Sequence, residues 1–85
     1  MEADTNDASG REIEIPVEGL PVAVSRGAAK RVPGLVIHHA ERCTEEGVTT
    51  YDLEGVADGV EYELEVSASG EVLEVETDHD EEDDD

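Results

Sequence analysis

Four segments in which apolar and polar residues alternate, joined by short turns, constrain the fold of this chain more than any other feature. The segments are residues 35–43, 48–56, 60–68 and 71–77. Asp58-Gly59, between two of them, is the strongest two-residue hairpin signal in the sequence. Strands joined by short turns pair with one another in antiparallel order, so the pattern predicts an antiparallel meander of four strands.

The alternation predicts one apolar and one acidic face for this sheet. The residues expected on the apolar face are Leu35, Ile37, Tyr51, Leu53, Tyr62, Leu64, Val66, Leu73 and Val75. The glutamates of the last hairpin expected on the opposite face are Glu61, Glu63, Glu65, Glu74 and Glu76. Their carboxylates are expected about 5 Å from cross-strand neighbours, on a face that no other element covers.

Residues 20–32 are predicted to form a helix that covers the apolar face. Its apolar stripe recurs every four residues, at Leu20, Val24, Ala28 and Val32. Pro21 falls in the first turn, where a missing amide donor is harmless, and Pro33-Gly34 ends the helix. Gly27 lowers helix stability by up to about 1 kcal/mol relative to Ala, which indicates close packing against a neighbour. One helix on an antiparallel sheet is an α+β fold.

The two ends of the chain differ from this middle part. Ile13, Ile15 and Val17 have period two around Pro16, which is typical of an additional N-terminal edge strand. The residues before this strand, 1–12, are predicted to be a disordered arm. Residues 78–85, which include His79, are predicted to be a disordered acidic tail, so a single domain spans residues 13–77.

The charge is strongly negative, with 25 Asp and Glu against 5 Lys and Arg and a net charge of −20. Such a surface repels nucleic acid and anionic membranes, and neither is expected as a partner. Three interpretations compete: a disordered acidic chain, an acidic mimic that captures a basic partner, and an ordinary domain from a cytoplasm with molar salt. Periodic apolar residues argue against the first, and acids spread over every segment except the helix argue against the second. At molar salt the Debye length is about 3 Å, so neighbouring carboxylates hardly repel one another. We therefore expect a halophilic protein of haloarchaeal type.

The sequence offers no sign of export. The first ten residues lack the basic and apolar regions of a signal peptide, and no apolar run approaches the length of a membrane span. The single cysteine, Cys43, excludes an internal disulfide and suits a reducing interior. These features predict a cytoplasmic location.

No catalytic set is evident. His38 and His39 are adjacent in a predicted strand, so we expect them on opposite faces, where they cannot bind one metal ion. Cys43 has only Arg42 nearby to lower the pKa of its thiol, and it is interpreted as a passive thiol or as one that pairs with a second chain. The carboxylates alternate onto an open face, which does not provide the desolvated partner of an acid/base pair. We expect no enzyme activity, no cofactor and no metal.

Four of the five basic residues lie within residues 20–44, where Glu41 is the only acid. They are Arg26, Lys30, Arg31 and Arg42. In one interpretation these cations pair with nearby glutamates. In the other they form a docking face for an acidic partner or for the acidic sheet of a second copy, which would favour a homodimer.

The order of short motifs from residue 19 to residue 76 resembles the PepSY and PepSY-like families. The motifs are an LP-opened helix closing at PG, a strand with Ile37, a strand with Tyr51 and Leu53, the YELEV strand after Asp58-Gly59, and the final GEVLE strand. The resemblance implies one helix on an antiparallel sheet and a role in binding and restraining peptidases or other proteins. The sequence thus predicts a non-catalytic protein-binding module, with a self-associating structural protein as the alternative.

Overall fold

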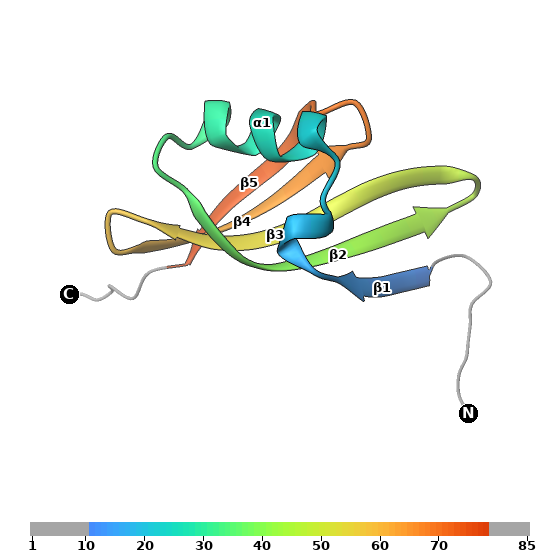
Figure 1. The fold of residues 1–85 in the computed structure, drawn as a ribbon, viewed down its shortest axis with the longest axis horizontal. Coiled ribbons are helices and arrows are strands. Elements are labelled where there is room, and N and C mark those ends of the chain that lie inside the picture. The colour runs from blue at the N-terminus through green and yellow to red at the C-terminus, as the bar shows by residue number, and fades with distance from the viewer. Residues whose placement is uncertain (1–10, 79–85) are drawn as a thin grey trace.

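One helix packs on one face of a five-stranded antiparallel sheet in the computed structural model, which describes residues 11–78 (Figure 1). The elements are β1 (Arg11–Ile15), the 3-10 helix η2 (Val17–Gly19), α1 (Val22–Arg31), β2 (Val36–Glu45), β3 (Val48–Ala57), β4 (Val60–Ser67) and β5 (Val72–Asp78). The strands lie in the sheet in sequence order. The predicted α+β meander is confirmed, with a fifth strand at the N-terminal edge. Residues 1–10 of the predicted arm and residues 79–85 of the predicted tail, including His79, lie outside the described residues.

The first strand begins earlier and ends earlier than the sequence indicated. β1 starts at Arg11, inside the predicted arm, and stops at Ile15. Pro16 follows, and it has no amide hydrogen with which to continue the sheet. Val17 therefore lies in η2 rather than in a strand.

Two hairpin turns have the backbone shape that fits the twist of antiparallel strands. Asp58-Gly59 joins β3 to β4 with φ angles of 54° and 77°, as the sequence predicted. Glu46-Gly47 joins β2 to β3 with φ angles of 53° and 81°. Positive φ at both central residues is the mark of a type I′ turn, which requires residues that tolerate the left-handed region.

The helix supplies one side of a small core. The carbonyl of Pro21 accepts hydrogen bonds from the amides of Val24 and Ser25, at 3.0 and 3.1 Å, so the helix begins at Val22 and not at Leu20. α1 packs on β4 and β5. The buried apolar residues are Leu20, Val24, Ala28, Val32, Ala40, Tyr51, Leu53, Ala57, Leu64 and Val66. Among residues 11–78, no helix has the length and apolar character needed to cross a membrane.

Two bulges shift side chains away from the faces that simple alternation assigns them. Between β4 and β5 the register shifts after Glu65, which pairs with Glu74, to Val66, which pairs with Val72. Leu73 is thus the extra residue of β5, and Val72 packs against the core. Leu73, predicted on the apolar face, is instead 50% exposed. In β2 the register moves between Ile37 and His39, which makes His38 the extra residue. An extra residue in one strand breaks the period of two, and the sequence pattern does not reveal it.

Candidate functional site

The face of the sheet opposite α1 carries a row of carboxylates that crosses all five strands. Each member is the direct cross-strand partner of the next, and the row consists of Glu14, Glu41, Asp52, Glu65 and Glu74. A neighbouring row consists of His39, Glu54, Glu63 and Glu76. We call the first set the carboxylate row and this side of the sheet the acidic face. Directly opposed like charges destabilise a sheet, and salt weakens this effect by screening.

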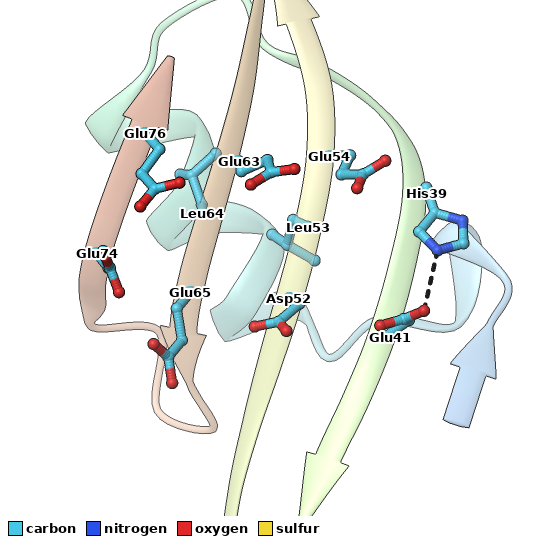
Figure 2. Close-up of a pocket in the computed structure, with 10 residues that line it drawn as sticks. All are labelled: His39, Glu41, Asp52, Leu53, Glu54, Glu63, Leu64, Glu65, Glu74 and Glu76. Atoms are coloured by element: carbon cyan, nitrogen blue, oxygen red, sulfur yellow. Dashed lines mark hydrogen bonds and ion pairs between the residues drawn. The ribbon is translucent and has the colours of Figure 1, made fainter. Parts of the chain in front are cut away.

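A shallow hollow lies on the acidic face over β3 and β4 (Figure 2). Its volume is about 260 Å³. Its rim is made by carboxylates of both rows together with His39, and Leu53 and Leu64 are its only apolar lining residues. Pockets for small molecules enclose about 300–1,000 Å³ and are mostly apolar. This hollow is smaller and far more polar than such a pocket, so it suits hydrated cations or solvent better than an enclosed substrate.

The two histidines both contact glutamates of the acidic face, which corrects the prediction that they lie on opposite faces. Nε2 of His38 is 3.1 Å from Oε2 of Glu61. His39 lies 3.3 Å from Glu14 through Nδ1 and 3.3 Å from Glu41 through Nε2. The bulge at His38 is the physical reason, because it places two successive side chains on one side of the strand. The histidines have separate carboxylate partners and do not converge on one point.

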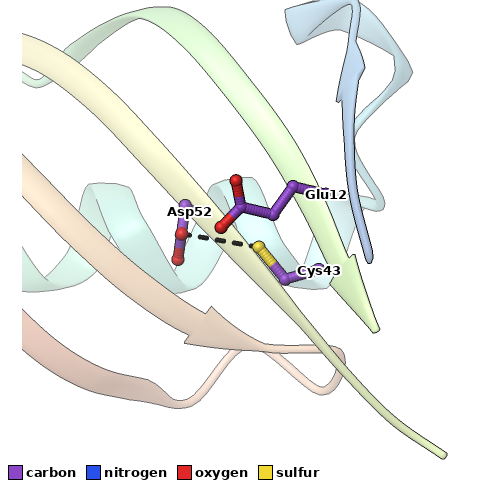
Figure 3. Close-up of side chains that lie close together, drawn as sticks. All are labelled: Glu12, Cys43 and Asp52. Carbon is purple, nitrogen blue, oxygen red and sulfur yellow. Dashed lines mark hydrogen bonds between the residues drawn. The ribbon is translucent and has the colours of Figure 1, made fainter. Parts of the chain in front are cut away.

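Cys43 lies between two carboxylates that the sequence pattern did not bring together (Figure 3). Its Sγ donates a hydrogen bond to Oδ2 of Asp52 at 3.4 Å. Burial, followed by the charge of Asp52, its hydrogen bond and the charge of Glu12, raises the pKa of the Cys43 thiol to about 12. The thiol therefore keeps its proton at neutral pH, which fits the prediction of a passive thiol. Ligand atoms of Glu12, Cys43 and Asp52 lie within 4.8 Å of one another, but a protonated thiol is a poor metal ligand, and we assign no ion to them.

The predicted docking residues fall into two groups. Arg26, Lys30 and Arg31 lie on α1 and are exposed, and no acidic residue occupies the helix. Arg42 is exposed in β2, paired with Ile13 and Tyr51, whereas α1 packs on β4 and β5. The three helical cations, which are close in sequence, therefore also share one element, whereas Arg42 lies on a different one.

The helical cations make no ion pairs with glutamates of the described chain. Among the side chains of residues 11–77, the ion pairs within 4.0 Å join His38 to Glu61 and His39 to Glu14 and Glu41, and none involves a cation of α1. In that part of the chain, the cations of α1 do not make the glutamate pairs expected in the first sequence interpretation.

Comparison of the chain with protein-family models, with curated proteins and with solved structures finds no match. The fold and the surface charges define a small α+β domain with an acidic sheet face and a cationic helix.

Proposed function

We propose that the protein is a non-catalytic protein-binding module of a high-salt cytoplasm, and that it docks through the outer surface of α1. The observation that carries the proposal is that Arg26, Lys30 and Arg31 are exposed while none of the ion pairs among the side chains of residues 11–77 involves them. Two arginines and a lysine on one helix form a positively charged surface on a chain of net charge −20. An acidic partner surface is complementary to it.

The outer surface of α1 combines charge with apolar area. Val22, Arg26 and Lys30 follow one another at intervals of four residues, which places them on the same side of the helix. Val22 is 63% exposed, so an apolar contact lies at one end of the stripe and two cations lie along it. Arg is enriched in protein interfaces because its planar guanidinium binds carboxylates with two parallel hydrogen bonds. The stripe fits an acidic partner with a small apolar spot.

Restraint of a peptidase is the particular role that the PepSY-like resemblance of residues 19–76 supports. The arrangement of one helix on an antiparallel sheet agrees with that resemblance at the level of the fold. A non-catalytic role is supported by the chemistry of the candidate groups. The Cys43 thiol has a raised pKa and is therefore a weak nucleophile, and the carboxylates of the hollow lie on an open face.

Self-association is the second candidate function, and the distribution of charge favours it. The cationic helix and the carboxylate row lie on opposite faces of the sheet, so the helix of one copy is complementary to the acidic face of another. Such a contact joins different surfaces and builds a chain of copies unless it closes into a ring.

Sedimentation equilibrium in 2 M KCl distinguishes the two functions. If the protein is a monomer over the whole concentration range, self-association is excluded. If the wild type associates and Arg26→Glu does not, α1 forms one side of the contact. Affinity capture at the same salt, followed by a titration with the purified partner, tests the docking module. We expect Arg26→Glu to weaken that binding about tenfold or more.

The matched control is Arg11→Glu, which makes the same change of charge on β1, away from α1. Binding should survive this change. Equal losses in both variants, or no loss in Arg26→Glu, would show that α1 is not the docking surface.

A further inference from the structure

The edge strand β1 is the least secured element of the sheet. It pairs with β2 alone, and four of its five residues are exposed. Of its two apolar side chains, Ile13 is 39% exposed, and only the half-buried Ile15 packs against the core. The chain after it is anchored independently, since Val17 packs against the core and Leu20 is buried within it. β1 lies at the opposite edge of the sheet from β4 and β5, on which α1 packs (Figure 1), so we do not expect its separation to unfold α1.

The pairing of β1 with β2 contains a direct conflict of charge. Glu14 of β1 and Glu41 of β2 are cross-strand partners on the acidic face. Like charges at directly opposed positions favour separation of the strands. Salt screens part of this repulsion, and a cation placed between the two carboxylates would offset the rest.

His39 lies where it can do so. Its Nδ1 is 3.3 Å from Oε2 of Glu14, and its Nε2 is 3.3 Å from Oε2 of Glu41 (Figure 2 shows the contact with Glu41). A neutral imidazole has one N–H donor and one nitrogen lone pair, so it can donate to only one of the two carboxylates. The imidazolium has a proton on each nitrogen and a positive charge, so only the protonated ring attracts both carboxylates at once. It therefore holds β1, through Glu14, more strongly than the neutral ring can.

Carboxylates from three strands surround the ring. They are Glu41 on its own strand β2, Glu14 on β1 and Glu54 on β3. The hydrogen bond to Glu41 is the largest influence, the three negative charges add to it, and partial burial opposes them. The net effect raises the pKa of His39 above its ordinary value.

We propose that His39 is a proton-dependent clamp that fastens the edge strand β1 to the sheet through Glu14 and Glu41. Loss of the proton leaves Glu14 and Glu41 in repulsion and one ring nitrogen without a proton to donate. β1 then separates more often and uncovers the backbone edge of β2. An uncovered edge presents unpaired N–H and C=O groups, the feature by which sheets take up extended segments. This inference goes beyond docking through α1 and does not depend on it.

The direction of the pH effect follows from the sign of the pKa shift. A histidine whose pKa is higher in the folded protein than in the unfolded chain stabilises the fold fully below the unfolded pKa. This contribution is lost as the pH rises through the raised folded value. β1 is thus expected to be held in mildly acidic solution and released in alkaline solution.

Hydrogen exchange of the full chain in 2 M KCl between pH 5.5 and 9 tests the clamp. After correction for the intrinsic pH dependence of exchange, protection of Arg11–Ile15 and of the facing residues 40–44 should fall about two- to tenfold as His39 loses its proton. Protection in β3 and β4 should not follow this titration. In His39→Gln, protection of β1 should be low and should not vary with pH.

His38→Gln is the matched control, because His38 is the neighbouring histidine and contacts Glu61 of β4 rather than β1. It should keep the wild-type pH profile. A wild-type profile in His39→Gln, or its loss in His38→Gln, overturns the proposal.

A second variant keeps the test decisive if His39→Gln fails to fold. Glu14→Gln retains His39 and Glu41 but removes both the repulsion and one arm of the clamp. Protection of β1 should then become independent of pH, and the His39 ring followed by NMR should titrate at a lower pH than in the wild type. An unchanged titration of the ring would refute the contact with β1.

Discussion

Gly27 of α1 packs backbone to backbone against Gly70 in the turn between β4 and β5. A Cβ atom on Gly27 would overlap the carbonyl oxygen of Gly70, and a Cβ atom on Gly70 would overlap the carbonyl oxygen of Ala23. Gly70 also has a φ angle of +96°, a region that other residues rarely adopt. The helix can therefore approach the sheet closely only while both positions lack a side chain.

Gly27→Ala is expected to destabilise the fold, although Ala is the better helix former. The added methyl group should force α1 away from the turn, with a loss of about 1–3 kcal/mol in the free energy of unfolding. The gain in helix propensity offsets at most about 1 kcal/mol of this. Urea unfolding in 2 M KCl measures the difference.

Gly19→Ala is the control for this prediction. A Cβ atom there would lie 3.6 Å from Cγ of Pro16, an ordinary contact, so stability should change by less than about 0.5 kcal/mol. A stabilised Gly27→Ala variant would mean that α1 packs less closely than described.

The contact at Gly27 was predictable because a glycine inside an otherwise regular helix needs a packing reason. The meander was predictable because Asp58-Gly59 and strict alternation are local signals. The bulges were not, since the extra residues His38 and Leu73 resemble any other residue of an alternating strand. The carboxylate row was foreseen only within the last hairpin, at Glu65 and Glu74.

The rest of the candidate site depends on strand register. Glu14 joins the row, and comes within reach of His39, only because β1 pairs with β2 in a particular alignment. Glu12 approaches Cys43 for the same reason. Sequence proximity was also misleading for Arg42, which lies on β2 and not on α1 with the other three cations.

Two leucines that share the predicted apolar face should respond very differently to the same substitution. Leu53 is 1% exposed and Leu73 is 50% exposed. Leu53→Ala should lower the free energy of unfolding by about 2–5 kcal/mol, which unfolds a domain this small or nearly so. Leu73→Ala should lower it by less than about 1 kcal/mol. Comparable losses in urea unfolding would place Leu73 in the core and remove the bulge in β5.

The Cys43 thiol should be unusually slow to alkylate. With a pKa of about 12, the thiolate at pH 8 is about 10³-fold scarcer than for a cysteine of ordinary pKa. Iodoacetamide should react more slowly by a similar factor in the folded protein than in the protein unfolded by urea. Mass spectrometry of the intact chain gives both rates.

Asp52→Asn should speed this reaction, because it removes a negative charge and an acceptor beside the thiol. Asp58→Asn is the control, since Asn-Gly suits the same turn and Asp58 lies in another part of the sheet. If both variants react at the wild-type rate, the charge of Asp52 does not govern the thiol.

The carboxylate row should make folding depend on salt. Glu65 faces Asp52 on one side and Glu74 on the other, so it takes part in two opposed pairs of like charge. At 3 M KCl the Debye length is below about 3 Å, whereas at 0.05 M it exceeds 10 Å and the row repels itself. The sheet signal in circular dichroism should therefore decrease as KCl is lowered from 3 M to 0.05 M.

Glu65→Gln removes two repulsive pairs, each worth roughly 0.2–1 kcal/mol, and should move the KCl concentration at the folding midpoint to a lower value. Glu45→Gln makes the same change opposite Val48, where no carboxylate faces it, and should leave the midpoint close to that of the wild type. A midpoint that moves equally in both variants would mean that net charge, rather than the row, sets the need for salt.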